Sequence, residues 1–418
     1  MRYLKITLII GFAVSLAVGV LFEAGAFRHL DIGLSNLLER LTPPAPLQHQ
    51  PVQFLLFILL AFGIAWATID INRPTLKIVV AAIAFLQVLI MPFVLNQYHI
   101  FFSPFPAALA TVLSFGAAFL YSRSDAGKRK RMLRSVFGLR LSQKAFTRLV
   151  DSNTPLQFNG ALREATIVVC EIFNHDILSE MLPVADYVAM TNQFLETGAE
   201  FLVEQDGYLD ECGGESLRVI FGAAIEDPEH ASKACSAALA LAAKLEKLNE
   251  ECEGKWKHRF DFRIGVNSGE VVTAAYGSKR LGSFSVAGET VEFSRRLCSA
   301  NLIYGSVILV GPETYALAAG AIEVRPIELI RGRTPNSREE IYELMAMKNV
   351  LTADDLRKRD LFWKGIVYYR EQQWEDALEY FQSSLTMTPA DAPVEFYIRR
   401  IEHMRTGTPL VEWENARI

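Results

Sequence analysis

Long apolar stretches alternate with short polar connections over the first 121 residues of the chain. Each stretch approaches the ~20 residues that an α-helix needs to cross a bilayer. The four stretches are Ile6 to Phe22, Val52 to Ile69, Leu76 to Leu95 and Ala107 to Tyr121. The pattern therefore predicts an α-helical transmembrane bundle over residues 1–122 and makes the lipid bilayer an expected partner.

Basic residues indicate how these helices are oriented. They lie before the first stretch, between the second and third, and after the fourth: Arg2, Lys5, Arg73, Lys77, Arg123, Lys128, Arg129, Lys130, Arg131 and Arg134. Because positive charge stays on the cytoplasmic side, we expect a multi-pass protein of the inner (cytoplasmic) membrane with everything after residue 122 inside. The alternative is a signal peptide cleaved near 24–26, which leaves three spans and the same cytoplasmic side.

Two amphipathic segments flank the predicted spans. Residues 29–41 should form a helix on the outer membrane surface, either as a sensor or as a plain connector. Residues 123–160 should form a juxtamembrane, signal-transmitting segment, with apolar positions from Leu133 to Leu149 at helical spacing. This helix could pair with a copy of itself or pack on its own domain.

From residue 161 to 348 the pattern alternates between short apolar strands and longer amphipathic helices, which predicts an α+β domain with a ferredoxin-like order. Strands are expected at 165–171, 208–211, 216–221, 260–267 and 271–276, and helices at 184–203, 231–249 and 289–300. Gly213 and Gly214 indicate a hairpin between the second and third strands.

Residues 349–418 form the predicted tail. The positions Gly365, Tyr368, Ala377, Phe381, Ser384 and Pro389 have the spacing of one tetratricopeptide (TPR) repeat, with Trp374 in its turn. A single repeat cannot bury its own apolar face, so we expect it to pack on the preceding domain or on a helix over 392–404. Binding of a protein partner by this tail is a further hypothesis.

Composition narrows the function classes. The 418 residues carry a net charge of -5, which gives no reason to expect nucleic-acid binding. The five cysteines all follow residue 122 without CxxC spacing, which argues for reduced thiols rather than disulfides or a zinc site.

Four blocks of the α+β region resemble the class III adenylate/guanylate cyclase family. They are Thr166 to Glu171, Gly207 to Gly222, Arg263 to Val272 and Val286 to Leu297. The last two blocks argue against diguanylate cyclases, whose hairpin motif the glycines only partly resemble. The resemblance implies a domain that works as a homodimer, since two copies meet head to tail in this family, with a heterodimer with another cyclase chain as an alternative.

The resemblance also implies site residues, several of them altered. Glu171 and Glu215 match the two aspartates that bind Mg²⁺ or Mn²⁺ in the family. Glu211 and Ser285 match the pair that reads the base of ATP or GTP; a carboxylate accepts hydrogen bonds from guanine, so the pair leans toward GTP.

Three further positions concern the triphosphate. Arg296 matches the arginine that stabilises transition-state charge, and Arg333 lies where the family usually has a phosphate-binding lysine. Glu292 replaces the asparagine one helical turn before Arg296, and the two should form a salt bridge at i and i+4.

Two functions follow from these expectations. One is a membrane-bound enzyme that converts ATP or GTP to a 3',5'-cyclic nucleotide and pyrophosphate. The other is a catalytically degenerate pseudoenzyme that transmits a membrane signal or pairs with an intact cyclase or other partner. The altered carboxylates and Glu292 favour weak or absent turnover.

Overall fold

The computed structural model describes residues 2–39, 47–48, 50–71, 74–98, 100–123, 132–134, 136–152, 160–277, 282–331 and 338–406. The chain divides into two compact units. The first comprises Met1–Ser135 and Val150–Asn153, and the second comprises Val136–Leu149 and Thr154–Ile418.

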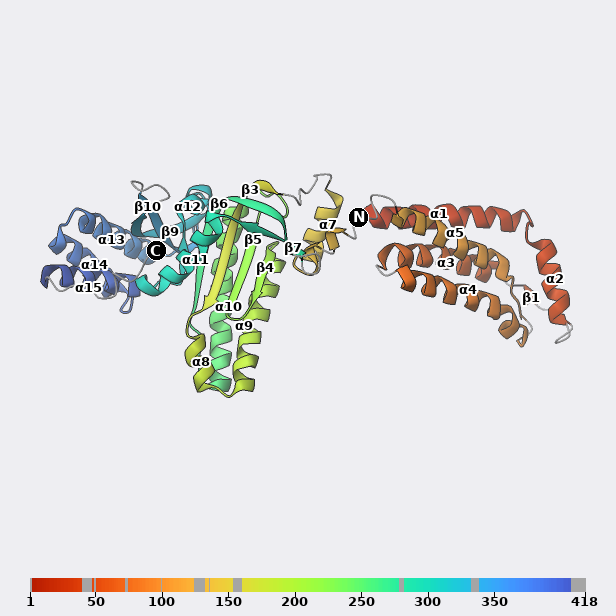
Figure 1. Ribbon diagram of the computed structural model, residues 1–418, viewed down its shortest axis with the longest axis horizontal. Helices are drawn as coiled ribbons and strands as arrows, with labels where there is room; N and C mark the ends of the chain where they lie inside the picture. The colour runs from red at the N-terminus through yellow and green to blue at the C-terminus, as the bar shows by residue number, and fades with distance from the viewer. Residues whose placement is uncertain are drawn as a thin grey trace. The chain divides into compact units, whose positions relative to one another are not determined.

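Four long apolar helices build the first unit (Figure 1). They are α1 (Arg2–Glu23), α3 (Gln50–Asp70), α4 (Pro74–Asn96) and α5 (Pro104–Arg123), and each is long and apolar enough to cross a membrane. Small and apolar side chains such as Val18, Ala61 and Ala110 are buried between them, whereas Leu16 and Leu120 are 58% and 72% exposed. Exposed leucines on helices of this length suit a surface that faces lipid, and the four predicted helices are confirmed.

The connections at one end of this bundle are also ordered. Helix α2 (Arg28–Glu39) occupies the predicted amphipathic segment, with Leu38 buried and Leu30 and Leu37 about half exposed. The short strands β1 (Leu47–Gln48) and β2 (Ile100–Phe101) pair in parallel, so the starts of α3 and α5 lie side by side.

An eight-stranded mixed sheet forms the centre of the second unit. Its strands are β3 (Ala161–Ile172), β4 (Tyr208–Gly213), β5 (Ser216–Phe221), β6 (Phe262–Gly277), β7 (Gly282–Ala287), β8 (Ile308–Val310), β9 (Ile322–Arg331) and β10 (Arg338–Met347). The order is β4-β5-β3-β6-β8-β10-β9, with β7 paired to β6. Only the β6–β8 pairing is parallel among these described strands.

Strand β6 differs from the sequence prediction, which placed two strands over this segment. The expected turn does not form because Asn267 and Ser268 are fully buried and stay in the ladder opposite β3. The Asn267 amide donates to the carbonyl of Thr290 at 3.0 Å, and the Ser268 hydroxyl lies 2.7 Å from that of Thr166. These tertiary hydrogen bonds pair the Asn267 amide nitrogen and the Ser268 hydroxyl, two polar groups that a turn would have exposed.

Helices cover both faces of the sheet. Helices α9 (Val184–Glu204), α10 (His230–Trp256) and α12 (Pro312–Ala318) pack on one face, and α8 (His175–Met181) adjoins α9. Helix α11 (Glu289–Tyr304) packs on the other face (Figure 1). Residues 165–170 of β3 are therefore buried without alternation, as is typical of a strand covered on both faces.

Contact between β6 and α11 is unusually close at Gly265. A Cβ atom there would lie 2.5 Å from the backbone nitrogen of Cys298 and would also collide with the carbonyl oxygen of Ser294. Any side chain at this position would force the helix backbone away from the strand.

Three helices form the tail, α13 (Ala353–Arg370), α14 (Trp374–Met387) and α15 (Ala392–Thr406). Gly365 faces the ring of Phe381, where a Cβ atom would lie 2.6 Å from the ring. The apolar residues of all three helices share one core with α11 and the sheet, including Tyr304 and Ile327. The tail thus packs both on the preceding domain and on its own third helix, as expected.

A buried arginine links the tail to the sheet. Arg325 on β9 donates to Glu343 of β10 at 2.6 Å and to both carboxylate oxygens of Asp391, just before α15, at 2.7 and 2.9 Å. Its guanidinium also lies 4.6 Å from the ring centre of Phe362 in α13.

The juxtamembrane segment is not the single helix that the apolar spacing predicted. Gly138 has a φ of +54°, and the helix α7 (Gln143–Asp151) begins only after the turn that follows. Phe137 is buried, with its ring 5.6 Å from that of Tyr208 and 5.0 Å from that of Phe284. Phe137, Leu141 and Leu149 are buried and belong to the same compact unit as the sheet, whereas Leu139 is 95% exposed. This part of the segment packs on its own domain, and pairing with a second copy stays a prediction.

Candidate functional site

The two predicted metal carboxylates lie side by side. Glu171 is the penultimate residue of β3, and Glu215 lies in the β4–β5 hairpin. The loop is Gly214–Glu215, closed by the pair Gly213 and Ser216, and Gly214 has the positive φ of 61° that such a turn requires. The backbone nitrogen of Ile172 donates to the carbonyl of Glu215 at 2.9 Å, so the hairpin is held against the end of β3.

Other charged groups act on Glu171. Burial raises the pKa of its carboxyl, the Arg295 guanidinium and the Ser216 hydroxyl lower it, and the carboxylates of Glu215 and Glu211 raise it. The Ser216 hydroxyl lies 3.5 Å from Glu171 Oε1. The three glutamates are thus close enough to interact electrostatically.

Carboxylate oxygens are donors of the kind that Mg²⁺ and Mn²⁺ prefer, and Mg²⁺ commonly uses one or two carboxylates together with water and substrate phosphates. Glu171 and Glu215 fit that requirement. Within the described ranges, no group of three or more His, Cys, Asp or Glu side chains is arranged to hold a metal ion. A metal held by these two carboxylates would complete its coordination with water or, when nucleotide is bound, with phosphate oxygens.

The predicted base-reading residues lie on β4 and β7. Tyr208 joins these strands, since its hydroxyl donates to the carbonyl of Phe284 at 2.5 Å. Ser285 is half-buried opposite Ala274. Glu211 is directed toward two arginines, with Oε2 accepting from Arg218 at 2.9 Å and from Arg295 at 3.1 Å.

Helix α11 carries the predicted transition-state pair, and the expected salt bridge between Glu292 and Arg296 is wrong. Arg296 reaches back along the helix and pairs with Glu289, and its guanidinium lies 5.1 Å from the ring centre of Phe293. Glu292 is 63% exposed, with Oε1 4.0 Å from Arg295. Side chains on a helix lean toward its N-terminus, which brings Arg296 to the first turn.

Arg295 is the site residue that sequence reasoning missed. Its spacing of three residues from Glu292 was a local signal for one of its contacts. Its other partner, Glu211, lies 84 residues away in the chain, a contact that needs the folded sheet. The predicted residue Arg333 lies outside the described residues, and its role stays a prediction.

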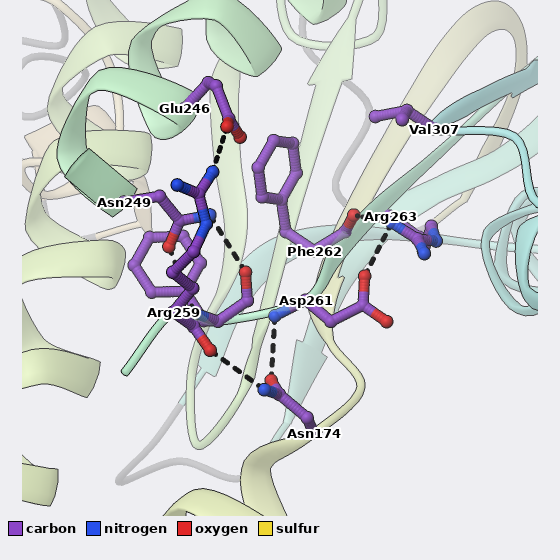
Figure 2. Close-up of a pocket in the computed structure, with 9 residues that line it drawn as sticks. Asn174, Glu246, Asn249, Arg259, Asp261, Phe262, Arg263 and Val307 are labelled. Carbon is purple, nitrogen blue, oxygen red and sulfur yellow. Dashed lines mark hydrogen bonds and ion pairs between the residues drawn. The ribbon is translucent and has the colours of Figure 1, made fainter. Parts of the chain in front are cut away.

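A separate cavity of about 290 Å³ lies near the start of β6 (Figure 2). The side-chain amide of Asn249 donates to the Phe260 carbonyl and accepts from the Phe260 backbone nitrogen, both at 3.0 Å. In the same way, Asn174 donates to the Arg259 carbonyl at 2.9 Å and accepts from the Asp261 backbone nitrogen at 2.8 Å.

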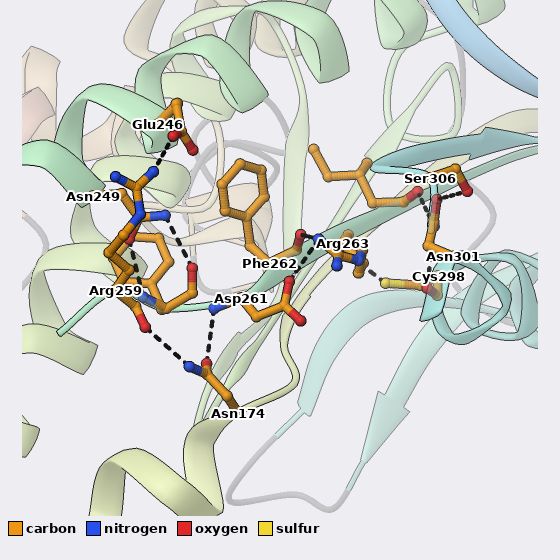
Figure 3. A network of polar contacts seen from close by, with 12 residues as sticks. Asn174, Glu246, Asn249, Arg259, Asp261, Phe262, Arg263, Cys298, Asn301 and Ser306 are labelled. Atoms are coloured by element: carbon orange, nitrogen blue, oxygen red, sulfur yellow. Dashed lines mark hydrogen bonds and ion pairs between the residues drawn. The ribbon is translucent and has the colours of Figure 1, made fainter. Parts of the chain in front are cut away.

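Charged side chains around this cavity are paired with one another. Arg259 pairs with Glu246 and Glu253, and Arg263 with Asp261 at 2.6 Å. Figure 3 shows the polar contacts continuing from Arg263 to α11. These contacts fasten the start of β6 to α10 and α11, which gives the cluster a structural role.

Residues 159–345 match the model of the adenylate and guanylate cyclase catalytic domain. This part of the chain belongs to the class III adenylate/guanylate cyclase family. Among curated proteins, the chain is similar to adenylate cyclase 1 of Rhizobium meliloti (strain 1021), with 25% identity over 185 residues. It is also similar to the uncharacterized protein Rv1318c of Mycobacterium tuberculosis (strain ATCC 25618 / H37Rv), with 28% identity over 174 residues.

The alignments cover 44% and 41% of this chain but only 28% and 30% of those two relatives. Two solved cyclase structures are also similar to a part of this chain. The guanylyl cyclase Cya2 is 22% identical, with a TM-score of 0.42 over 46% of this chain and 97% of that one. The adenylyl cyclase CyaB from P. aeruginosa is 21% identical, with a TM-score of 0.42 over 47% and 100%.

Proposed function

We propose that this chain is a membrane-anchored nucleotide cyclase homologue that acts in intracellular signal transduction. Its cyclase domain binds ATP or GTP together with Mg²⁺ or Mn²⁺ through Glu171 and Glu215. The observation that carries the proposal is the contact of the β4–β5 hairpin with the end of β3, which brings these two carboxylates together in a domain of this family. The four candidate spans support anchoring in the inner membrane as a multi-pass protein.

Turnover would form a bond between the ribose 3'-oxygen and the α-phosphorus, with pyrophosphate leaving. A divalent ion supplies Lewis-acid polarisation of the phosphate in such reactions. Each glutamate here is one methylene longer than aspartate, by about 1.5 Å, and a misplacement of ~1 Å can cost ~100-fold in rate. Glu292 adds a negative charge on α11. We therefore expect slow turnover, with Mn²⁺ supporting it better than Mg²⁺.

The second candidate is a pseudoenzyme that binds nucleotide or a partner and relays a membrane signal without turnover. The engagement of Glu211 by Arg218 and Arg295, and of Arg296 by Glu289, favours it, because these side chains are committed to one another. In this case a homodimer, or a heterodimer with an intact cyclase chain, would be the working form. The TPR-like tail would offer a surface for a protein partner.

Both candidates are separated by measurements on the full chain in nanodiscs. The protein is incubated with ATP or GTP, each with Mg²⁺ or Mn²⁺, and cyclic nucleotide is quantified by mass spectrometry while nucleotide binding is measured by equilibrium dialysis. Binding with slow turnover supports the enzyme, and binding without turnover supports the pseudoenzyme. No metal-dependent binding of either nucleotide would contradict the enzyme and a nucleotide-binding pseudoenzyme, and would leave only a pseudoenzyme that acts through a protein partner. The Glu171→Ala variant is the control, which should lose the metal dependence.

Membrane topology is tested by reporter fusions placed after Gln50 and after Lys128. We expect them to report opposite sides of the inner membrane, with the second in the cytoplasm. The same side for both would contradict the four-span arrangement.

A further inference from the structure

Arg295 lies among the acidic side chains of the candidate site. Its Nη2 lies 3.1 Å from Glu211 Oε2, and its Nη1 lies 4.0 Å from Glu292 Oε1. Its charge also acts on Glu171. One guanidinium therefore interacts electrostatically with carboxylates from β3, β4 and α11, three elements that are distant in the chain.

Glu211 is held by a second arginine, but the two arginines differ in their freedom to move. The side chain of Arg218 is 13% exposed and is fixed by Asp210, which is itself buried, at 2.6 Å. The side chain of Arg295 is 42% exposed, and of its two ion-pair partners Glu292 is the more distant and the more exposed. Arg295 can thus leave the cluster without breaking an ion pair to a buried carboxylate, whereas Arg218 cannot.

We propose that Arg295 is an intramolecular counter-ion that holds the nucleotide site closed, so that a divalent cation must displace its guanidinium to reach the carboxylates. This inference rests on the proposed function of the same site. The cluster holds several negative charges at short range, which repel one another unless a cation lies between them. The guanidinium supplies that cation before any metal arrives, and its positive charge repels an incoming divalent ion.

Displacement also gives Arg295 a new role. Once released, its planar guanidinium can form paired hydrogen bonds with phosphate oxygens, the anions that arrive with the metal. Metal and nucleotide should therefore bind cooperatively to this chain, each favouring the same displaced position of Arg295.

The test measures Mn²⁺ binding without nucleotide, using the full chain in nanodiscs and the loss of the electron paramagnetic resonance signal of free Mn²⁺. Arg295→Met keeps the length of the side chain and removes its charge, and it should bind Mn²⁺ about tenfold more tightly than the unmodified protein. Arg295→Lys keeps the charge and should stay close to the unmodified protein. The gain should disappear when Glu171→Gln is added to Arg295→Met, which locates the ion at this cluster.

Arg259→Ala is the matched control. Arg259 is 40% exposed and also pairs with two glutamates, but those belong to α10, away from the cluster. Its removal should leave Mn²⁺ affinity unchanged. Equal affinities of Arg295→Met and the unmodified protein, or an equal gain with Arg259→Ala, would overturn the inference. Because no nucleotide is present, this outcome is independent of whether the unmodified protein binds ATP or GTP.

Discussion

Replacing Arg325 by methionine should detach the C-terminal helices from the sheet at a lower temperature than in the unmodified protein. Arg325 is 6% exposed and holds two carboxylates, Glu343 on β10 and Asp391 before α15, at 2.6 to 2.9 Å. Methionine would preserve most of the apolar packing against Phe362 but would leave both acids without their cation.

Breaking a buried ion pair from one side typically costs about 3–5 kcal/mol, because the remaining charge stays buried. For a domain of this size, 1 kcal/mol corresponds to about 2–4 °C in the melting temperature. We therefore expect the Arg325→Met variant to melt about 10 °C lower at neutral pH.

The loss should depend on pH. Burial raises the pKa of Glu343 above its ordinary value of 4.5, and Arg325 lowers it. Without the arginine the pKa of Glu343 in the folded state rises further above its ordinary value of 4.5. At any pH above 4.5 the folded state is therefore destabilised, because the unfolded chain ionises this carboxyl more easily. Stability of the variant should fall as the pH rises from about 4.5 through the raised pKa, and should approach that of the unmodified protein in acid.

The assay is thermal unfolding of the full chain in detergent, followed by tryptophan fluorescence. Trp374 is a local reporter, since its ring lies 5.5 Å from that of Tyr369 within the tail. Arg259→Ala, which breaks exposed ion pairs, should cost less than about 1 kcal/mol. An unchanged melting temperature for Arg325→Met at pH 7, or a loss that is the same at pH 5 and pH 7, would refute the reasoning.

Three other predictions concern the tail, α10 and the site. Gly365→Ala should cost about 1–3 kcal/mol in the free energy of unfolding, because the new Cβ would lie 2.6 Å from an aromatic ring of α14. An unchanged free energy of unfolding would show that α13 and α14 can move apart without cost. Burial lowers the pKa of His230 below 6.5, so thermal stability should decrease as the pH falls below 6.5 through that lowered pKa, and His230→Gln should lack this component. The triple variant Glu171→Asp, Glu215→Asp, Glu292→Asn should make cyclic nucleotide faster than any single variant, and a folded but inactive triple variant would contradict our assignment of the site.

Local patterns were sufficient to predict much of the fold. The four spans follow from apolar length alone, and β5 begins and ends at the expected residues, Ser216 and Phe221. The hairpin and the end of β3 follow from glycines and a buried strand, whereas the placing of Glu171 and Glu215 in one site was implied by the resemblance to the cyclase family. For the spans and the hairpin the determining interactions lie within a few residues of chain.

Features that depend on distant contacts could not be predicted in this way. The continuity of β6 depends on Thr290 and Thr166, which form hydrogen bonds with Asn267 and Ser268 from other elements. The choice of Arg296 between two acidic residues of the same helix depends on its side-chain conformation rather than on spacing. The association of Arg295 with Glu211 requires α11 and β4 to be placed by the whole sheet.

The missing side chain at Gly265 determines which parts of the site can move. Because α11 rests directly on the backbone of β6, and β6 is paired with β3, the backbones that carry Arg295, Arg296 and Glu171 are held together. Strand β4 is at the edge of the sheet, and Arg140 of the juxtamembrane segment holds it through hydrogen bonds at Leu209 and Asp210. A pull on this segment would therefore move the hairpin that carries Glu211 and Glu215 relative to the backbone of α11.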